Sequence, residues 1–131
     1  MSTTAAINTL RARGMRVSAA RRRLLEALYA TGRPATAAEL ADGLDLASTY
    51  RNLDALQAAG LVRHLHAGHG PGLFAATGAG EREYAVCEDC GTTRAFAPGE
   101  LDDVRAAVAE ACGFSVGFDH FPLVGRCPRC D

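Results

Sequence analysis

The sequence predicts an α+β chain made of two small modules, and three observations support this prediction. The chain has 131 residues, of which 48% are hydrophobic and 22% charged, so it can bury a core in one domain or in two small ones. Apolar residues recur at helical spacing in the first half, whereas short strand-like runs are more frequent in the second. Four of the five cysteines form two Cys-x-x-Cys pairs, both in the second half.

Length and motif content exclude several classes of protein. The chain is too short for a Rossmann enzyme or a barrel, and it lacks the G-x-x-x-x-G-K-[ST] loop of P-loop nucleotidases. No run approaches the roughly 18 uninterrupted apolar residues of a membrane helix. Residues 1–14 lack the basic and then apolar pattern of a secretory signal, so we expect a cytoplasmic protein without membrane contact.

The charge is distributed unevenly, although the formal net charge is only −1. Residues 1–76 carry nine arginines against five acidic residues, and residues 77–131 carry five arginines against ten. A basic front half beside an acidic back half predicts two modules, the first of which faces a polyanion.

Helices are expected in the first sixty residues, where capping residues precede apolar stripes. Ser18 can cap a helix whose stripe contains Leu24 and Leu28. Thr36 can cap the next helix, with Glu39 three residues later as in a capping box. The expected helices cover residues 4–13, 19–31, 37–44 and 47–59.

A β-hairpin is expected directly after these helices. Residues 61–66 alternate like a strand, residues 67–72 are rich in glycine, and residues 73–76 form a returning strand. The last three of these helices, followed by a hairpin, describe a winged helix-turn-helix with residues 67–72 as the wing. The helix over 47–59 would then be the recognition helix that enters the DNA major groove.

The second module is expected to be a small α/β unit. Strands are predicted over 81–86 and 92–96, a helix over 101–112, and a last strand within 114–125 that is interrupted at Pro122. Cys112 is expected on the inner, apolar face of the helix. The predicted domains are residues 1–76 and 81–131, joined by a flexible hinge at 77–80.

The paired cysteines predict a structural zinc site. Each Cys-x-x-Cys pair places two thiolates on one turn, and two pairs complete a tetrahedral, closed Zn²⁺ shell. The alternatives are disulfides, which an intracellular chain disfavours, and a redox motif, which would occur once at a helix start in a βαβ unit. The predicted zinc ligands are Cys87, Cys90, Cys127 and Cys130.

These motifs together give the chain a family resemblance. The runs ASTYRNLDALQAAGLVRHL, VCEDCG and LVGRCPRC, in that order, resemble the bacterial ferric uptake regulator (Fur) family of metal- and peroxide-responsive transcription factors. The resemblance extends from about Arg16 to Cys130. It implies a homodimer in which the first module binds DNA and the second is the dimerisation domain. It also implies repression at AT-rich inverted repeats, usually with metal as co-repressor.

Candidate DNA contacts follow from the recognition helix and from exposed arginines. The resemblance supports Tyr50 packing on thymine methyl groups, and Arg51 can pair with a phosphate or with guanine. A core position for Tyr50 and a solvated face for the arginine run are the alternatives. The predicted DNA-binding residues are Arg16, Arg21, Arg22, Ser48, Thr49, Tyr50, Arg51 and Arg63.

The regulatory metal site of the family is degenerate in this sequence. The run before the first cysteine pair, residues 81–84, has no histidine where the family is usually rich in histidine. Ala95 stands where a carboxylate is common, and Asp119 aligns with a usual histidine. Most of the standard sensor ligands are therefore missing.

Three explanations remain open: a relocated sensor site, a regulator that has lost metal sensing and binds DNA constitutively, and a redox response through the zinc cysteines. A relocated site would take a second divalent ion, Zn, Fe, Mn or Ni. Its histidines could equally be wing surface residues near DNA phosphates. The candidate ligands are His64, His66, His69, Glu81, Glu83, Asp102, Asp119 and His120.

The sequence thus predicts a DNA-binding transcription regulator, a repressor that reads an inverted-repeat operator as a homodimer. An enzyme is disfavoured, because four cysteines close the metal shell and no HExxH, nucleophile-elbow or paired-carboxylate motif is present. A zinc-ribbon module for protein interaction is the remaining rival.

Overall fold

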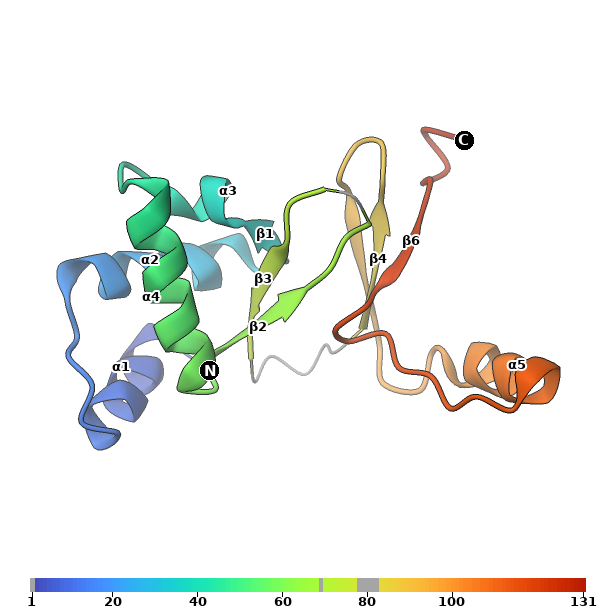
Figure 1. Cartoon of the computed structure of the whole chain (residues 1–131), viewed down its shortest axis with the longest axis horizontal. Coiled ribbons are helices and arrows are strands. Elements are labelled where there is room, and N and C mark those ends of the chain that lie inside the picture. The colour runs from blue at the N-terminus through green and yellow to red at the C-terminus, as the bar shows by residue number, and fades with distance from the viewer. Residues whose placement is uncertain (1, 69, 78–82) are drawn as a thin grey trace. The chain divides into compact units, whose positions relative to one another are not determined.

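The computed structural model describes residues 2–68, 70–77 and 83–131, and it divides into two compact units (Figure 1). Unit 1 comprises Met1–His64 with Pro71–Ala79, and unit 2 comprises Leu65–Gly70 with Gly80–Asp131. Of the expected hinge at 77–80, only Thr77 is among the described residues. The elements in chain order are α1 (Thr3–Ala12), α2 (Ala19–Thr31), β1 (Ala35–Thr36), α3 (Ala37–Ala41), α4 (Leu46–Ala58), β2 (Val62–Leu65), β3 (Leu73–Ala76), β4 (Glu83–Cys87), β5 (Thr93–Phe96), α5 (Asp102–Cys112) and β6 (Leu123–Gly125).

The helix caps of unit 1 follow the sequence closely. The Ser18 hydroxyl accepts from the Arg21 amide at 3.1 Å, and α2 ends at Gly32 in the left-handed conformation. The Thr36 hydroxyl accepts from the Glu39 amide at 3.1 Å, while the Glu39 carboxylate accepts from the Thr36 amide at 3.2 Å. Both predicted caps, including the reciprocal capping box, are therefore confirmed.

Two boundaries around α3 and α4 differ from the expectation. Helix α3 ends at Ala41 rather than at residue 44, because Asp42 and Gly43 both have positive φ, 39° and 86°. Helix α4 begins at Leu46, since Asp45 is its N-cap and accepts from the Ser48 amide at 2.8 Å. Asp45 and Leu46, which lie between the two expected helices, are therefore the N-cap and the first residue of α4.

The core of unit 1 lies where α2, α3 and α4 meet the hairpin. Its apolar side chains come from the predicted helical stripes and from both hairpin strands, and all of them are buried. Burial of such side chains is the main favourable contribution to folding. The largest members include Leu24, Leu25, Leu28, Leu40, Leu53, Leu56, Leu61, Val62 and Phe74.

The sheet of unit 1 has the order β1-β3-β2, so the hairpin gains a third strand. Strand β1 pairs antiparallel with β3, with Ala35 opposite Phe74 and Thr36 opposite Leu73. This two-residue strand was not expected, because two residues carry no recognisable alternation. Helices followed by this small sheet form the predicted winged helix.

We expect Thr36→Ala to lower the free energy of unfolding of unit 1 by about 1 kcal/mol, because it removes the α3 cap. Urea unfolding followed by circular dichroism measures this loss. Thr4→Ala, an exposed threonine within α1, is the control and should cause no comparable loss. An equal effect of the two substitutions would contradict a capping role.

Acid should weaken the hydrogen bond between the Glu39 carboxylate of the capping box and Arg33. Hydrogen bonding with Arg33 holds the pKa of Glu39 below its usual 4.5. A carboxylate with a lowered folded-state pKa stabilises the fold above its unfolded pKa. Its contribution is therefore complete above pH 4.5 and disappears as the pH falls through the folded-state value.

Unit 2 is built on the sheet β5-β4-β6. Strand β4 pairs antiparallel with β5 and parallel with β6, with Cys87 opposite Gly125. Only three residues of the expected last strand, Leu123–Gly125, are regular, and they begin directly after Pro122, which has no amide hydrogen to donate.

Helix α5 has no buried residue in this chain. Leu101, which precedes the helix, is buried, but Val104 and Cys112 are exposed. The expectation that Cys112 lies on an inner face is therefore wrong for the single chain; its thiol donates to the Val108 carbonyl at 3.3 Å. The apolar residues of this helix do recur at helical spacing. Spacing alone does not show whether other residues of the same chain bury them.

No helix within the described residues is long and apolar enough to cross a membrane.

Candidate metal centre and nucleic-acid interface

The four paired cysteines meet because β6 runs parallel beside β4. Cys87 ends β4 and Cys90 lies in the turn that follows. The Glu88 amide donates to the Gly125 carbonyl at 2.7 Å, which holds the ends of β4 and β6 together. The chain leaving β6 then places Cys127 and Cys130 next to the first pair.

The geometry of these cysteines fits a zinc ion. The four Sγ atoms all lie within 4.8 Å of one another, and those of Cys90 and Cys127 are 3.7 Å apart. A tetrahedral shell with Zn–S bonds of about 2.3 Å requires sulfur separations of about 3.8 Å. No two cysteines of the described chain form a disulfide. Four sulfur ligands leave no open position, so the donor set suits structural rather than catalytic zinc.

The thiols at this centre have strongly divergent acidities. Amide donors from Cys90 (3.5 Å) and Cys127 (3.4 Å) lower the pKa of Cys87 to about 6. Hydrogen bonds with the neighbouring thiols, Cys127 first, raise the pKa of Cys130 to about 12. Four thiolates this close together repel one another, so a divalent ion would supply the charge that lets all four be deprotonated.

The start of α4 presents Tyr50 and Arg51 on the surface of unit 1. Tyr50 is 39% exposed and meets Phe74 edge-on at 6.2 Å between ring centroids, so it is not a core aromatic. Arg51 is exposed, and its guanidinium donates to the Ser48 hydroxyl at 2.9 Å. These two side chains can reach a ligand without rearrangement of the core.

Thr49 does not belong to this surface. It is fully buried, and its hydroxyl donates to the Asp45 carbonyl at 2.9 Å. The prediction of Thr49 as a DNA contact was wrong, because this position of α4 faces the core.

Arg21 also has a different place from the one expected. Its Nε donates to Asn52 Oδ1 at 3.1 Å and its Nη1 to the Arg16 carbonyl at 2.7 Å, while Asn52 Nδ2 donates to the Ser48 carbonyl at 2.9 Å. Arg21 thus joins the start of α2 to α4, a role that sequence reasoning missed. Spacing alone cannot reveal it, because the partner lies 31 residues away.

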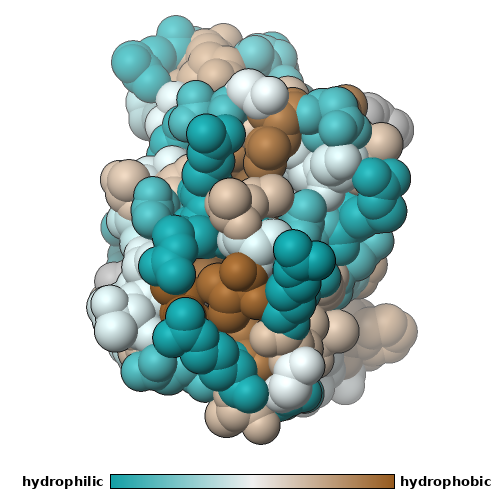
Figure 2. Space-filling view, turned by 90° about the vertical axis from the view of Figure 1, so that its left-hand side faces the viewer, coloured by the Kyte–Doolittle hydropathy of each residue, from teal (hydrophilic) through white to brown (hydrophobic). Residues whose placement is uncertain are grey.

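The remaining predicted arginines are distributed over unit 1. Arg16 and Arg22 are exposed and Arg63 is half-buried on β2. Figure 2 shows one side of the molecule, where hydrophilic side chains surround smaller apolar areas.

Three of the predicted regulatory histidines, His64, His66 and His120, are among the described residues, and each has an aromatic neighbour. His64 stacks on Phe74 with 5.0 Å between ring centroids. In unit 2, the ring of His66 stacks on Phe121 at 5.2 Å and meets the ring of His120 edge-on at 4.8 Å. The His66 amide also donates to the His120 carbonyl at 2.9 Å.

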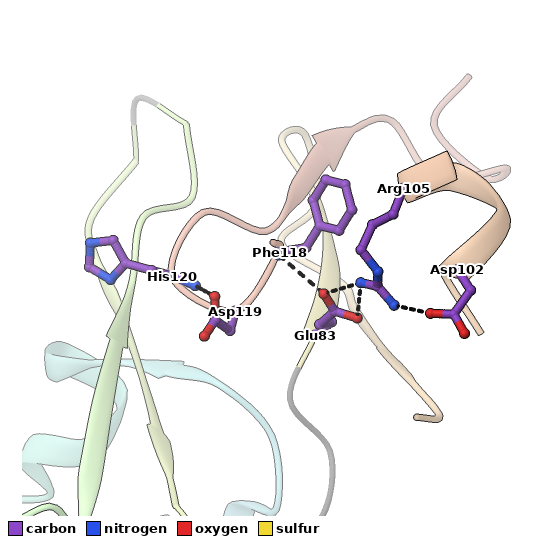
Figure 3. A network of polar contacts seen from close by, with 6 residues as sticks. All are labelled: Glu83, Asp102, Arg105, Phe118, Asp119 and His120. Atoms are coloured by element: carbon purple, nitrogen blue, oxygen red, sulfur yellow. Dashed lines mark hydrogen bonds and ion pairs between the residues drawn. The ribbon is translucent and has the colours of Figure 1, made fainter. Parts of the chain in front are cut away.

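The predicted carboxylate ligands are engaged with other groups. Figure 3 shows Glu83 of β4 pointing at Arg105 of α5, which contacts Asp102 on its other side. Asp119 accepts from the His120 amide at 3.0 Å. Within the described residues, only the four cysteines bring three or more metal-ligating groups together. Two further candidates, His69 and Glu81, lie outside those residues.

Comparison with known proteins gives a consistent result. The family model described as the ferric uptake regulator family matches residues 12–120. The chain is 29% identical over 132 residues to the peroxide operon regulator of Bacillus subtilis strain 168, covering 95% of this chain and 90% of that protein.

Two solved structures have a similar fold. The Helicobacter pylori ferric uptake regulator has a TM-score of 0.76 at 16% identity, with 99% of this chain and 94% of that chain covered. The Vibrio cholerae ferric uptake regulator has a TM-score of 0.71 at 26% identity, with 92% and 98% covered.

Proposed function

We propose, from the premise that this chain belongs to the ferric uptake regulator family, that it is a homodimeric repressor that reads an inverted repeat in double-stranded DNA. Members of the family are DNA-binding transcription regulators and not enzymes. The observation that carries the proposal is the exposed start of α4, where Tyr50 and Arg51 lie on the surface of unit 1.

Three kinds of residue would take part in DNA binding: residues that contact bases, residues that contact phosphates and a residue that positions α4. Helix α4 would enter the major groove, with Tyr50 against thymine methyl groups and Arg51 on a guanine edge or a phosphate. Exposed Arg16 and Arg22 would neutralise backbone phosphates. Arg21 would act as a positioning residue, because its hydrogen bond to Asn52 fixes α4 against α2.

Unit 2 would hold one structural zinc ion and form the dimer contact. The cysteines would bind the ion, which supplies a cross-link between the ends of β4 and β6. The dimer contact is supported by apolar surface that one chain leaves open, including Phe114 at 68% and Phe121 at 64% exposure. Helix α5, which buries none of its residues, provides further surface of this kind.

The protein would also bind a second, regulatory divalent ion (Zn, Fe, Mn or Ni). Occupancy of this site would follow the concentration of the metal in the cell and would change the affinity for DNA. His66 and His120 are the remaining ligand candidates with adjacent rings, because imidazole suits these metals. Metal content per chain before and after EDTA, with DNA affinity followed in the same samples, tests this part. DNA affinity that does not change with metal would instead support a constitutive regulator.

The salt dependence of DNA affinity tests the proposed interface. With duplex DNA selected from a randomised library, the affinity of the wild type should fall steeply as salt rises, because bound phosphates release counterions. We expect Arg22→Met to reduce the log–log slope by about 0.9, the value for one lost phosphate contact. Arg21→Met should weaken binding with the slope unchanged, since its guanidinium positions α4. Fluorescence anisotropy across a salt series measures both quantities.

Arg33→Met is the matched control for these arginines. Arg33 also lies on unit 1, but its guanidinium is paired with Glu39 at 2.7 Å, so its loss should change the slope little. Affinity without salt dependence in the wild type would contradict the DNA-binding proposal. A reduced slope for Arg21→Met would instead show that Arg21 contacts a phosphate directly.

A further inference from the structure

The guanidinium of Arg105 lies between two carboxylates that the sequence predicted as metal ligands (Figure 3). Its Nη1 is 2.8 and 2.6 Å from the two carboxylate oxygens of Glu83, and its Nη2 is 2.7 Å from Asp102 Oδ1. We infer that Arg105 is the resident cation of this cluster, and that Glu83 and Asp102 consequently do not hold a second metal ion.

Both oxygens of Glu83 already accept hydrogen bonds. Both of its oxygens bind the same guanidinium nitrogen, and Oε2 also accepts from the Phe118 amide at 3.2 Å. The side chains of Glu83 and Arg105 are only 16% and 29% exposed. Partial burial of a charge-assisted pair strengthens it relative to a surface pair. A metal ion bound by both oxygens of Glu83 would have to compete with the guanidinium and with the Phe118 amide for them.

Charge also disfavours a divalent ion at this place. The guanidinium already supplies one positive charge to the two carboxylates, and a second cation nearby would be repelled. The hydrogen bonds to Glu83 and Asp102 raise the pKa of Arg105 above its ordinary value, so it stays charged at every physiological pH. Neutralisation of Arg105 therefore does not offer a route to metal entry.

The same contacts explain how α5 is held in unit 2. The helix buries none of its own residues, yet Arg105 connects it to β4 through Glu83, and Glu83 connects β4 to the backbone at Phe118. A metal ion bound by carboxylates from these segments would make the same connection only when the metal is present. The link that Arg105 makes between α5 and β4 does not depend on metal. This inference does not depend on the DNA-binding proposal.

Titration of the zinc-loaded full chain with Mn²⁺ tests the inference, because Mn²⁺ prefers oxygen ligands. Calorimetry should show that Glu83→Gln leaves Mn²⁺ binding by the chain unchanged. Arg105→Ala should unfold at a lower temperature than the wild type. It should also bind Mn²⁺ at least tenfold more tightly and recover part of its thermal stability in Mn²⁺, because its carboxylates are released.

A matched control is available in the same unit. Arg94 pairs with Glu100 at 2.6 Å on the surface, without a second carboxylate, so Arg94→Ala should gain no Mn²⁺ affinity. Arg105→Lys retains the positive charge and should also gain none. Arg105→Gln removes the charge but keeps a long polar side chain, and it replaces Arg105→Ala in the test if that variant does not fold.

Two results would overturn the inference. The first is a wild-type Mn²⁺ site that disappears in Glu83→Gln, which would make Glu83 a ligand despite Arg105. The second is a folded Arg105→Ala that gains no Mn²⁺ affinity, which would show that Arg105 does not keep the metal out.

Discussion

Cys130→Ser should abolish tight zinc binding and unfold unit 2, while the helices of unit 1 remain. The reason is the small core of unit 2, where Tyr84, Val86 and Leu101 are among the few buried apolar side chains, whereas unit 1 has a continuous buried cluster. Zinc binding by small structural sites contributes about 10–16 kcal/mol. The loss of this free energy is therefore far larger than the effect of any single packing substitution on stability. Zinc per chain by mass spectrometry and hydrogen exchange along the chain measure the two effects.

The fifth cysteine provides the control for this prediction. Cys112 is exposed and lies outside the cluster of four, so Cys112→Ser should keep the zinc and the protection of unit 2. Retention of one zinc ion and of full exchange protection in Cys130→Ser would contradict a four-cysteine structural site.

Tyr50→Ala should weaken binding to selected operator DNA by about 10- to 100-fold, which corresponds to about 1–3 kcal/mol for a lost base contact. The ring is partly exposed and meets Phe74 only by its edge, so the substitution should leave unit 1 folded. Competition by unselected duplex separates a loss of specific affinity from a general loss of DNA binding.

Tyr50→Phe distinguishes the apolar ring from the hydroxyl. If the ring packs on thymine methyl groups, the phenylalanine variant should bind the operator nearly as well as the wild type. Wild-type affinity in Tyr50→Ala would place the recognition surface elsewhere than at the start of α4.

Features encoded in neighbouring residues could be predicted from the sequence. The caps at Ser18 and Thr36 need only residues three positions apart, and the doubled Cys-x-x-Cys motif contains its own ligand geometry. Helical spacing likewise placed Leu24 and Leu28 in the core. Strand β1 was missed because its pairing with β3, not its two residues, defines it.

The contacts that could not be predicted join side chains far apart in the sequence. A guanidinium can donate to a phosphate, an amide oxygen or a carboxylate. Which of these acceptors lies within reach depends on the fold. Arg21 contacts Asn52, and Arg105 contacts Glu83, across 31 and 22 residues. Glu83 and Asp102 were predicted as metal ligands, whereas in this structure both carboxylates contact the guanidinium of Arg105.

The parallel pairing of β4 with β6 also has a consequence for the order of folding. The zinc shell needs Cys127 and Cys130, which follow every other element, so the cluster closes a loop that contains β5 and all of α5. Closing a long loop costs conformational entropy before its contacts form. The winged helix, whose core excludes these cysteines, can fold while the later residues are still being synthesised. Unit 2 can complete its fold only after the last cysteine pair has emerged, which makes zinc capture a late step in its assembly.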